Sequence, residues 1–210
     1  MIVMRILCLV IGYACGMFLT ADVVTRIKIK KSVFEIGTHN PGMANVMHEL
    51  GFWPGAVVLM GDIFKTFIAC AICGSLFPVL GMTGIMYAGV GTVLGHDFPV
   101  WHGFRGGKGV AVTCVLLIFF APIYGTLSDV VGMLVVFATG FLGLGAIVIT
   151  SVYGVISIFT NSLEVTLLVI ALDLLMISRH YRAIGRMIHG KEPQILKLFG
   201  RKRKEDESDD

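Results

Sequence analysis

The feature that most constrains the fold is a run without any lysine or arginine, which covers residues 110–178. Apolar side chains dominate this run, and similar apolar stretches cover residues 6–24 and 53–94. A transmembrane helix needs roughly 20 consecutive apolar residues, so these stretches offer room for several such helices. The chain is 56% hydrophobic and 15% charged over 210 residues, which excludes an ordinary soluble domain. We therefore expect an all-α membrane protein.

The basic residues predict how this protein lies in the membrane. They gather in three clusters, at residues 26–31, at Arg105 and Lys108, and at residues 179–204. The positive-inside rule places all three clusters in the cytoplasm, which requires an even number of crossings between successive clusters. Two helices fit between the first two clusters and four between the last two. With the first helix, the chain is expected to have about seven transmembrane helices, an outside N-terminus and a cytoplasmic C-terminus.

Residues 1–200 are expected to form a single integral-membrane domain, followed by a charged tail at residues 201–210. The tail has a basic block and then an acidic block, a composition typical of a disordered segment. Gly12 and Gly16 predict a small-residue packing face on the first helix. Turns are expected inside the lysine-free run at Ser128 and Asp129, at Thr150 and Ser151, and at residues 161–164.

A polar, glycine-rich break at residues 95–111 separates two apolar stretches and carries Arg105 and Lys108. Glycines let backbone N–H groups approach an anion closely, and a lysine adds a mobile positive charge. The spacing excludes a nucleotide-binding P-loop, because His102 stands where the first glycine is needed and Gly109 where a serine or threonine is needed. The break therefore predicts a phosphate-binding loop without a nucleotide.

Two further segments carry groups that suit an anion. Residues 35–51 contain turn-forming residues and the hydroxyl of Thr38, which favours backbone N–H groups pointing at one anion, although an ordinary cytoplasmic loop explains the composition equally well. Residues 179–192 carry arginines, for which simple anchoring at the cytoplasmic face is the alternative. Since the charge argument puts all three segments on one side, we infer a phosphorylated substrate at the inner membrane surface.

Over essentially its whole length the chain resembles the bacterial acyl-phosphate:glycerol-3-phosphate acyltransferases of the PlsY type. The most specific motif is the middle one: His96, Phe98 and Pro99, followed by residues 104–111, match G-H-x-F-P…F-x-G-G-K-G-V-A. Asp62 and Lys65 match the D-x-x-K of the second helix. We interpret this charge pair as structural support beneath the site, because intramembrane charges are costly unless they face protein or water.

The other two motifs depart from the pattern, so the resemblance is to a divergent member. In the first motif, His48 stands in place of an arginine, His39 in place of a glycine, and Ser32 and Phe34 in place of an aspartate and an arginine. In the third motif Ala183 replaces an asparagine. The resemblance implies that the missing arginine and asparagine help to hold glycerol 3-phosphate, so the departures bear on the acceptor.

The resemblance implies transfer of a fatty acyl group from acyl phosphate to the 1-hydroxyl of glycerol 3-phosphate, giving lysophosphatidic acid for phospholipid biosynthesis. It also implies the bacterial cytoplasmic membrane, with the active face in the cytoplasm and membrane lipids around the chain. No cofactor, metal ion or nucleic acid is expected. The residues carried over are His180, Lys108 and Thr38 as catalytic; Gly37, Asn40, Gly42, Asn45, His96, Gly106, Gly107 and Arg186 as phosphate-binding; and Asp62, Lys65, Glu192 and His48 as supporting.

Two alternatives remain at this point. A divergent paralogue would use another phosphorylated acceptor, or bind lipid phosphate without catalysis, and His48 and Ala183 favour it. A small multi-helix transporter would place polar groups near the middle of the membrane, in broken helices. The polar groups of this chain are instead expected at one face, which disfavours the transporter.

Overall fold

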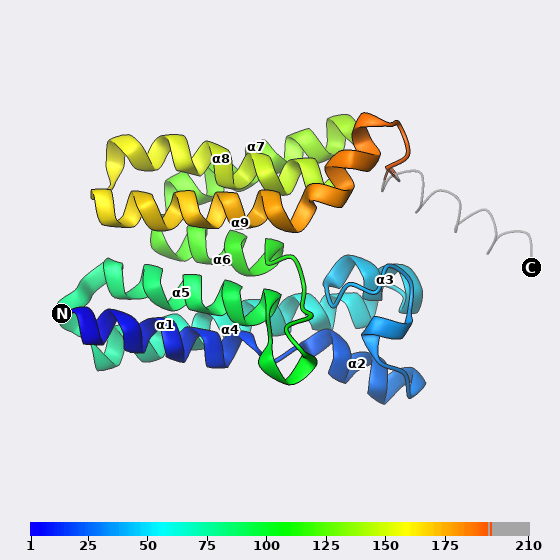
Figure 1. Cartoon of the computed structure of the whole chain (residues 1–210), viewed down its shortest axis with the longest axis horizontal. Helices are drawn as coiled ribbons and strands as arrows, with labels where there is room; N and C mark the ends of the chain where they lie inside the picture. The colour runs from blue at the N-terminus through cyan, green and yellow to red at the C-terminus, as the bar shows by residue number, and fades with distance from the viewer. Residues whose placement is uncertain (193, 195–210) are drawn as a thin grey trace, which may run out of the picture. The chain divides into compact units, whose positions relative to one another are not determined.

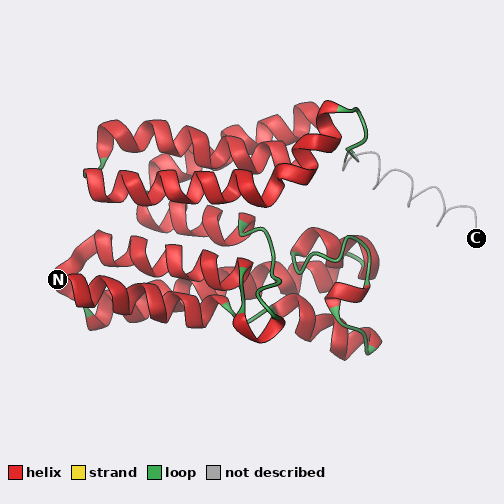
Figure 2. Cartoon of the chain, in the orientation of Figure 1, coloured by secondary structure: helices red, strands yellow, loops and turns green. Residues whose placement is uncertain are grey.

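The computed structural model describes residues 1–192 and 194, and the regular elements in that part of the chain are all helices (Figure 2). The chain divides into two compact units, Met1–Phe120 and the part from Ala121 onwards. The predicted tail at residues 201–210 lies outside the described residues. The single domain over residues 1–200 stays a prediction.

The first unit is built on three helices that run side by side, α1 (Ile2–Gly16), α4 (Phe52–Leu76) and α5 (Gly81–Asp97) (Figure 1). Its other elements are α2 (Thr20–Ile29), η1 (Val33–Glu35), α3 (Met43–Leu50), η2 (Pro78–Leu80), η3 (Val100–His102) and α6 (Val110–Phe120). A small apolar cluster of Ala21, Val33, Val46 and Val58 joins α2, η1 and α3 to α4. This cluster supports the short elements that carry the first polar loop.

Helices α1 and α5 approach each other so closely that their contact requires glycine. A β-carbon added at Gly12 would lie 1.9 Å from the carbonyl oxygen of Ala88, and one at Gly16 would lie 2.1 Å from that of Thr92. Glycines of α5 meet the backbone of α1 in the same way. Small residues on both sides let two helix backbones pack directly in a membrane. The predicted packing face of Gly12 and Gly16 is confirmed.

In the second unit, α8 (Leu142–Thr160) packs against both α7 (Pro122–Thr139) and α9 (Leu163–Ile188) (Figure 1). Local chemistry explains where these helices begin and end. Pro122 suits the first turn of α7 for two reasons. The φ of proline is fixed near the helical value, and the N–H that proline lacks would have no partner within the helix at this position. Gly140 ends α7 with a φ of +78°, and Ser162 accepts the N–H of Val165 at the start of α9.

Two of the three predicted turns in this unit are wrong. Ser128 and Asp129 lie inside α7, and Thr150 and Ser151 lie inside α8. Ser128 does not break its helix because its hydroxyl donates to the carbonyl of Tyr124 in the preceding turn, at 2.8 Å. The turn expected at residues 161–164 is confirmed, since α8 ends at Thr160 and α9 begins at Leu163.

Five helical stretches among the described residues are long and apolar enough to cross a membrane. They are Ile2–Ile29, Phe52–Leu76, Pro78–His102, Pro122–Thr139 and Leu142–Thr160. The first contains both α1 and α2, so the single helix expected at residues 6–24 is interrupted between them. Helix α6 has only 11 residues, too few for a straight crossing. The helical membrane class is confirmed, whereas the number of crossings and the sides of the termini stay predictions.

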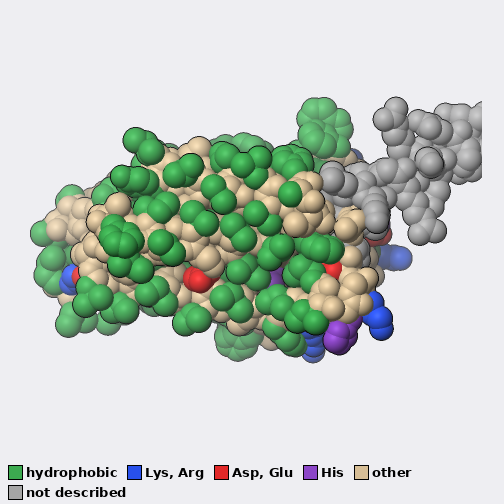
Figure 3. All heavy atoms as spheres, turned by 90° about the horizontal axis from the view of Figure 1, so that it is seen from above, with side chains coloured by type: hydrophobic (Ala, Val, Ile, Leu, Met, Phe, Trp, Pro, Cys, Tyr) green, Lys and Arg blue, Asp and Glu red, His purple; other side chains and the backbone are tan. Residues whose placement is uncertain are grey.

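The surface agrees with this class of protein. In the face drawn in Figure 3, hydrophobic side chains are spread over the whole described surface and charged side chains are few along its middle. Such a surface suits lipid, because exposing this much apolar surface to water is unfavourable.

Candidate functional site

Asn45, in the first turn of α3, holds the loop of residues 36–42 in shape. Its Oδ1 accepts the N–H of Thr38 at 2.8 Å, and its Nδ2 donates to the carbonyl of Ile36 at 3.3 Å. Gly37 has a φ of +51°, and a β-carbon there would lie 2.3 Å from the Asn45 Oδ1. The structure therefore brings Gly37, Thr38 and Asn45 into one small polar turn, and Thr38 is exposed on it.

Several backbone amides of this loop are already used within it. Besides that of Thr38, the N–H of His39 donates to the carbonyl of Ile36, and the N–H of Gly42 donates to that of Asn40, both at 2.9 Å. This differs from the expectation that the loop turns these N–H groups towards an anion. A tight turn must satisfy its own backbone before it can serve a ligand. Side-chain groups such as the hydroxyl of Thr38 are therefore the better candidates for binding.

Asp22 on α2 anchors the segment that leads into this loop. Its Oδ1 accepts the hydroxyl of Ser32 at 2.6 Å and the N–H of Val33 at 3.0 Å, while its Oδ2 accepts the Nε–H of Arg26 at 2.7 Å. Asp22 is only 6% exposed. Asp22 is not among the residues that the sequence motifs indicate. The available signal was a carboxylate in an apolar helix, placed four residues before an arginine.

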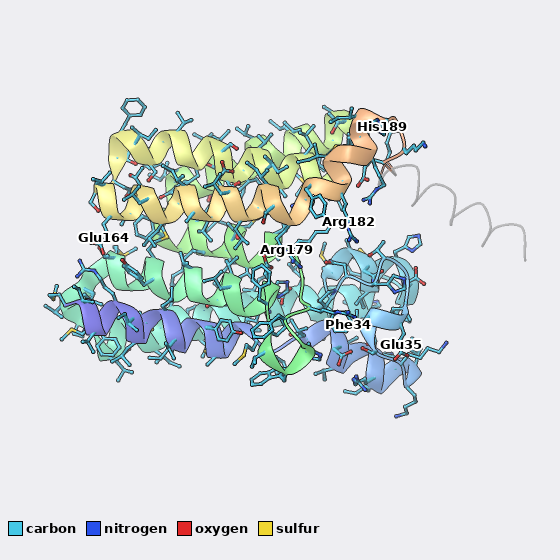
Figure 4. The ribbon with its side chains drawn as sticks, in the orientation of Figure 1. Phe34, Glu35, Glu164, Arg179, Arg182 and His189 are labelled. Carbon is cyan, nitrogen blue, oxygen red and sulfur yellow. The ribbon has the colours of Figure 1, made fainter. Side chains whose placement is uncertain are left out.

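The two histidines that depart from the family pattern also make contacts within the first unit. His39 has a φ of +59°, and its Nδ1 lies 2.8 Å from the carbonyl oxygen of Phe34. Figure 4 marks Phe34 on the segment between α2 and α3. The Nδ1 of His48 lies 2.8 Å from the Oε1 of Glu49. The residue that stands in place of the expected arginine is therefore in contact with a carboxylate.

A group of buried charged and polar side chains lies at the end of α5. Lys65 is 5% exposed, and its Nζ lies 2.7 Å from the Oδ1 of Asp62, 2.7 Å from the Nδ1 of His96 and 3.2 Å from the carbonyl oxygen of Phe18. Asp97, the last residue of α5, is fully buried. The predicted charge pair of Asp62 and Lys65 is therefore formed, and it contacts the predicted phosphate-binding residue His96.

The glycine-lysine loop folds back over this buried group. The N–H of Gly107 donates to the carbonyl of His96 at 2.9 Å, so this amide too is used within the protein. A β-carbon at Gly106 would lie 2.1 Å from the same carbonyl oxygen, and one at Gly107 would lie 2.0 Å from the Nε2 of His96. Only glycines allow so close an approach. The half-buried Lys108 follows directly on this turn.

In the second unit, His180 lies in the buried face of α9. It is 3% exposed, and its Nδ1 lies 2.9 Å from the carbonyl oxygen of Met176 one turn earlier. Gly143 of α8 faces it, since a β-carbon there would lie 3.0 Å from the imidazole Cδ2 and 3.4 Å from the β-carbon of Ala183. Ala183, which replaces the expected asparagine, is therefore buried next to His180.

Basic side chains gather at the C-terminal end of α9. Arg179, Arg182 and His189 lie towards this end, whereas Glu164 lies at the other (Figure 4). Two of the residues named from the sequence are in contact here, because the Nε–H of Arg186 donates to the Oε2 of Glu192. A shallow pocket at this end is lined by Arg182, Gly185, Arg186, His189 and Lys191.

Comparison with known proteins gives a consistent result. The sequence profile of the family described as glycerol-3-phosphate acyltransferase matches residues 6–190. Glycerol-3-phosphate acyltransferase 1 of Lactobacillus acidophilus is 34% identical over 194 residues, which are 91% of this chain and 93% of the relative. Glycerol-3-phosphate acyltransferase of Bacillus subtilis is 32% identical over 192 residues, which are 90% of this chain and 96% of the relative.

Two crystal structures of PlsY (YgiH), an integral membrane glycerol 3-phosphate acyltransferase, have the same fold. Its glycerol 3-phosphate form aligns with a TM-score of 0.82 and its lysophosphatidic acid form with 0.80; each is 26% identical and covers 93% of this chain and 98% of that chain. Fold, polar loops and similarities together define a helical integral membrane acyltransferase. The chain belongs to the glycerol-3-phosphate acyltransferase family.

Proposed function

We propose that this protein transfers a fatty acyl group from acyl phosphate to the 1-hydroxyl of glycerol 3-phosphate, giving lysophosphatidic acid and inorganic phosphate. The observation that carries the proposal is the alignment, over 93% of the chain, with a relative solved in glycerol 3-phosphate and lysophosphatidic acid forms. The hydroxyl oxygen bonds to the acyl carbonyl carbon, the bond from that carbon to the phosphate oxygen breaks, and phosphate leaves. Because the donor is already activated, the enzyme mainly orients its substrates and stabilises negative charge.

The first unit is assigned the donor's phosphate. The exposed hydroxyl of Thr38 binds it, with Asn40 beside it and Gly37 and Gly42 allowing close approach. Lys108 neutralises the charge that develops as phosphate leaves, because a compact ammonium fits a glycine-lined turn. Asn45, His96, Gly106 and Gly107 shape the two loops, and Asp62, Lys65 and His48 support them.

The second unit is assigned the acceptor's hydroxyl and a phosphate. A carbonyl oxygen only accepts hydrogen bonds, so the contact of His180 with Met176 places the proton on Nδ1. The Nε2 of His180 then carries a lone pair, which suits orientation or deprotonation of a hydroxyl. Phosphate of the substrate is the alternative base. Arg186 binds phosphate, and Glu192 holds its guanidinium in place.

The direct test is turnover by purified protein with palmitoyl phosphate and glycerol 3-phosphate. We expect lysophosphatidic acid and phosphate to appear in equal amounts, with no added metal or cofactor. A His180→Gln variant keeps a polar side chain but has no imidazole base, so it separates the two candidate bases. Strong loss of turnover assigns the base to His180, and near-normal turnover assigns it to substrate phosphate. No product from folded wild-type protein would contradict the proposed reaction.

We further propose the bacterial cytoplasmic membrane as the location, with the basic segments and the active face in the cytoplasm. The positive-inside rule supports it. After removal of the native cysteines, single cysteines at Lys30, Arg105 and Lys197 should all react with a membrane-impermeant reagent only when the cytoplasmic side is open. Labelling of any one of them from the outside would contradict this orientation.

A second candidate function is supported by the contact of His48 with Glu49. Where an arginine was expected to hold glycerol 3-phosphate, the structure has an imidazole bonded to a carboxylate, which repels an anionic acceptor when the imidazole is neutral. This observation favours a paralogue with a different phosphorylated acceptor. A panel of phosphorylated alcohols, compared by kcat/KM at one acyl phosphate concentration, decides between the two: the proposed function requires glycerol 3-phosphate to be the best acceptor.

A further inference from the structure

Three side chains from two helices make a continuous line of contacts beneath the glycine-lysine loop. Asp62 and Lys65 lie one turn apart on α4 with a 2.7 Å ion pair, and the Nζ of Lys65 reaches the Nδ1 of His96 on α5 at 2.7 Å. All three are buried. The opposite edge of the imidazole, Nε2, faces Gly107 of the loop. One end of this line is thus a carboxylate and the other end is the predicted phosphate-binding turn.

The hydrogen-bonding capacity of Lys65 determines which nitrogen of His96 carries the proton. A lysine ammonium has three donors and no acceptor. The Oδ1 of Asp62 and the carbonyl oxygen of Phe18 each accept one of these donors, so the third is directed at the Nδ1 of His96, which accepts it at 2.7 Å. The proton of a neutral imidazole is then on Nε2. A doubly protonated imidazole would bring two cations and two donors together, which costs energy even with the carboxylates of Asp62 and Asp97 nearby.

The position of this proton matters for an anion at the loop. A protonated Nε2 presents an N–H group on the side of Gly107, whereas the other tautomer would present a lone pair there and repel phosphate oxygens. We propose that Lys65 is a positioning residue: held by Asp62, it fixes His96 as the Nε2–H tautomer, so that a hydrogen-bond donor faces the Gly106–Gly107 turn. The role assigned to this turn rests on the proposed function, but the tautomer does not.

Nitrogen-15 NMR of the detergent-purified protein with labelled histidine tests the tautomer without any enzyme assay. A His96→Gln variant identifies the His96 signals. His180 is an internal reference, because its contact with the carbonyl of Met176 predicts the opposite, Nδ1–H tautomer. We expect His96 to show a protonated Nε2 and an unprotonated Nδ1. An Nδ1–H or doubly protonated His96 would overturn the proposal.

The role of Lys65 is tested with variants that leave no buried charge without its ion-pair partner. Removing only one partner of a buried ion pair is strongly destabilising, so Asp62→Asn is combined with Lys65→Met. In this double variant we expect His96 to become a mixture of tautomers and the KM for acyl phosphate to rise about tenfold or more. Lys28→Met, an exposed lysine of α2, is the matched control and should change neither. An unchanged His96 spectrum in the double variant would show that Lys65 does not set the tautomer.

The two readouts also separate this inference from the proposed function. If wild-type protein fails to acylate glycerol 3-phosphate while His96 is the Nε2–H tautomer and changes in the double variant, the tautomer control by Lys65 stands and the reaction is wrong. If turnover is normal and the double variant keeps the wild-type KM for acyl phosphate, the contribution of Lys65 to the site is refuted.

Discussion

The strongest test of how the first loop is held is the substitution Asp22→Ala. This change removes the carboxylate oxygen that accepts from two buried donors, the hydroxyl of Ser32 and the N–H of Val33. A buried donor left without an acceptor costs about 1–3 kcal/mol, so the two together are expected to cost about 2–6 kcal/mol. Because Ser32 also caps η1 by accepting the N–H of Phe34, the cost falls on the segment that leads into residues 36–42.

The measurement pairs thermal unfolding in detergent with the KM for acyl phosphate. Asp22→Ala should lower the apparent Tm and raise this KM, and Asp22→Asn, which keeps one acceptor oxygen, should fall between it and wild type. Arg26→Gln is the matched control, because it removes only the contact of the same carboxylate with an exposed guanidinium. Exposed ion pairs contribute little. If Arg26→Gln cost as much as Asp22→Ala, the buried contacts to Ser32 and Val33 would not be what holds the loop.

Three further predictions concern the site. Lys108→Ala should lower turnover by at least ~10²-fold. Lys108→Arg should also have low turnover, because a planar guanidinium does not replace a compact ammonium. A near-normal kcat in both variants would show that the loop has only a structural role. Gly107→Ala brings a β-carbon within 2.0 Å of His96 and should abolish turnover, whereas Gly154→Ala meets nothing within 4 Å and should be as active as wild type; equal activities would refute the close contact. His48→Arg combined with Ala183→Asn should lower the KM for glycerol 3-phosphate and leave that for acyl phosphate unchanged. The reason is that a hydrogen bond to a charged group contributes roughly 1.5–3 kcal/mol. An unchanged KM for glycerol 3-phosphate would show that neither position takes part in binding the acceptor.

The sequence predicted the helical membrane class well because bilayer thickness leaves few solutions for long apolar runs. It predicted two turns wrongly because polarity was taken to mark helix ends. Thr150 and Ser151 instead donate to the carboxylate of Asp173 on α9, so they are satisfied inside the helical unit. Gly140, whose φ is +78°, marks a real helix end. In a membrane, a polar residue with a partner on the next helix is no longer a turn signal.

For the candidate site, the motifs named Gly37, Asn45, His96 and Gly107 as phosphate-binding, and the structure brings Asn45 next to Gly37 and His96 next to Gly107; their role in binding phosphate stays a prediction. The motifs did not reveal that the N–H groups of Thr38 and Gly107 donate hydrogen bonds to other groups of the protein. Such partners depend on how the loops fold. Asp22 was missed because its partner Ser32 lies ten residues away, beyond any helical spacing. Local patterns therefore name candidate residues, whereas the hydrogen-bond partner of each group depends on contacts that only the folded chain makes.

The glycine contact between α1 and α5 has a consequence for how the chain is made. α1 is synthesised before α5, and α2, η1, α3, α4 and η2 come between them along the chain. Until α5 is present, the glycine face of α1 lacks the backbone of Ala88 and Thr92, against which Gly12 and Gly16 pack in the folded unit. The packing of α1 therefore stays incomplete until α5 has been made. The end of α5 that carries His96 reaches its position against α1 only when these two helices pack. Assembly of the first unit must therefore finish inside the bilayer, well after its first helix has entered it.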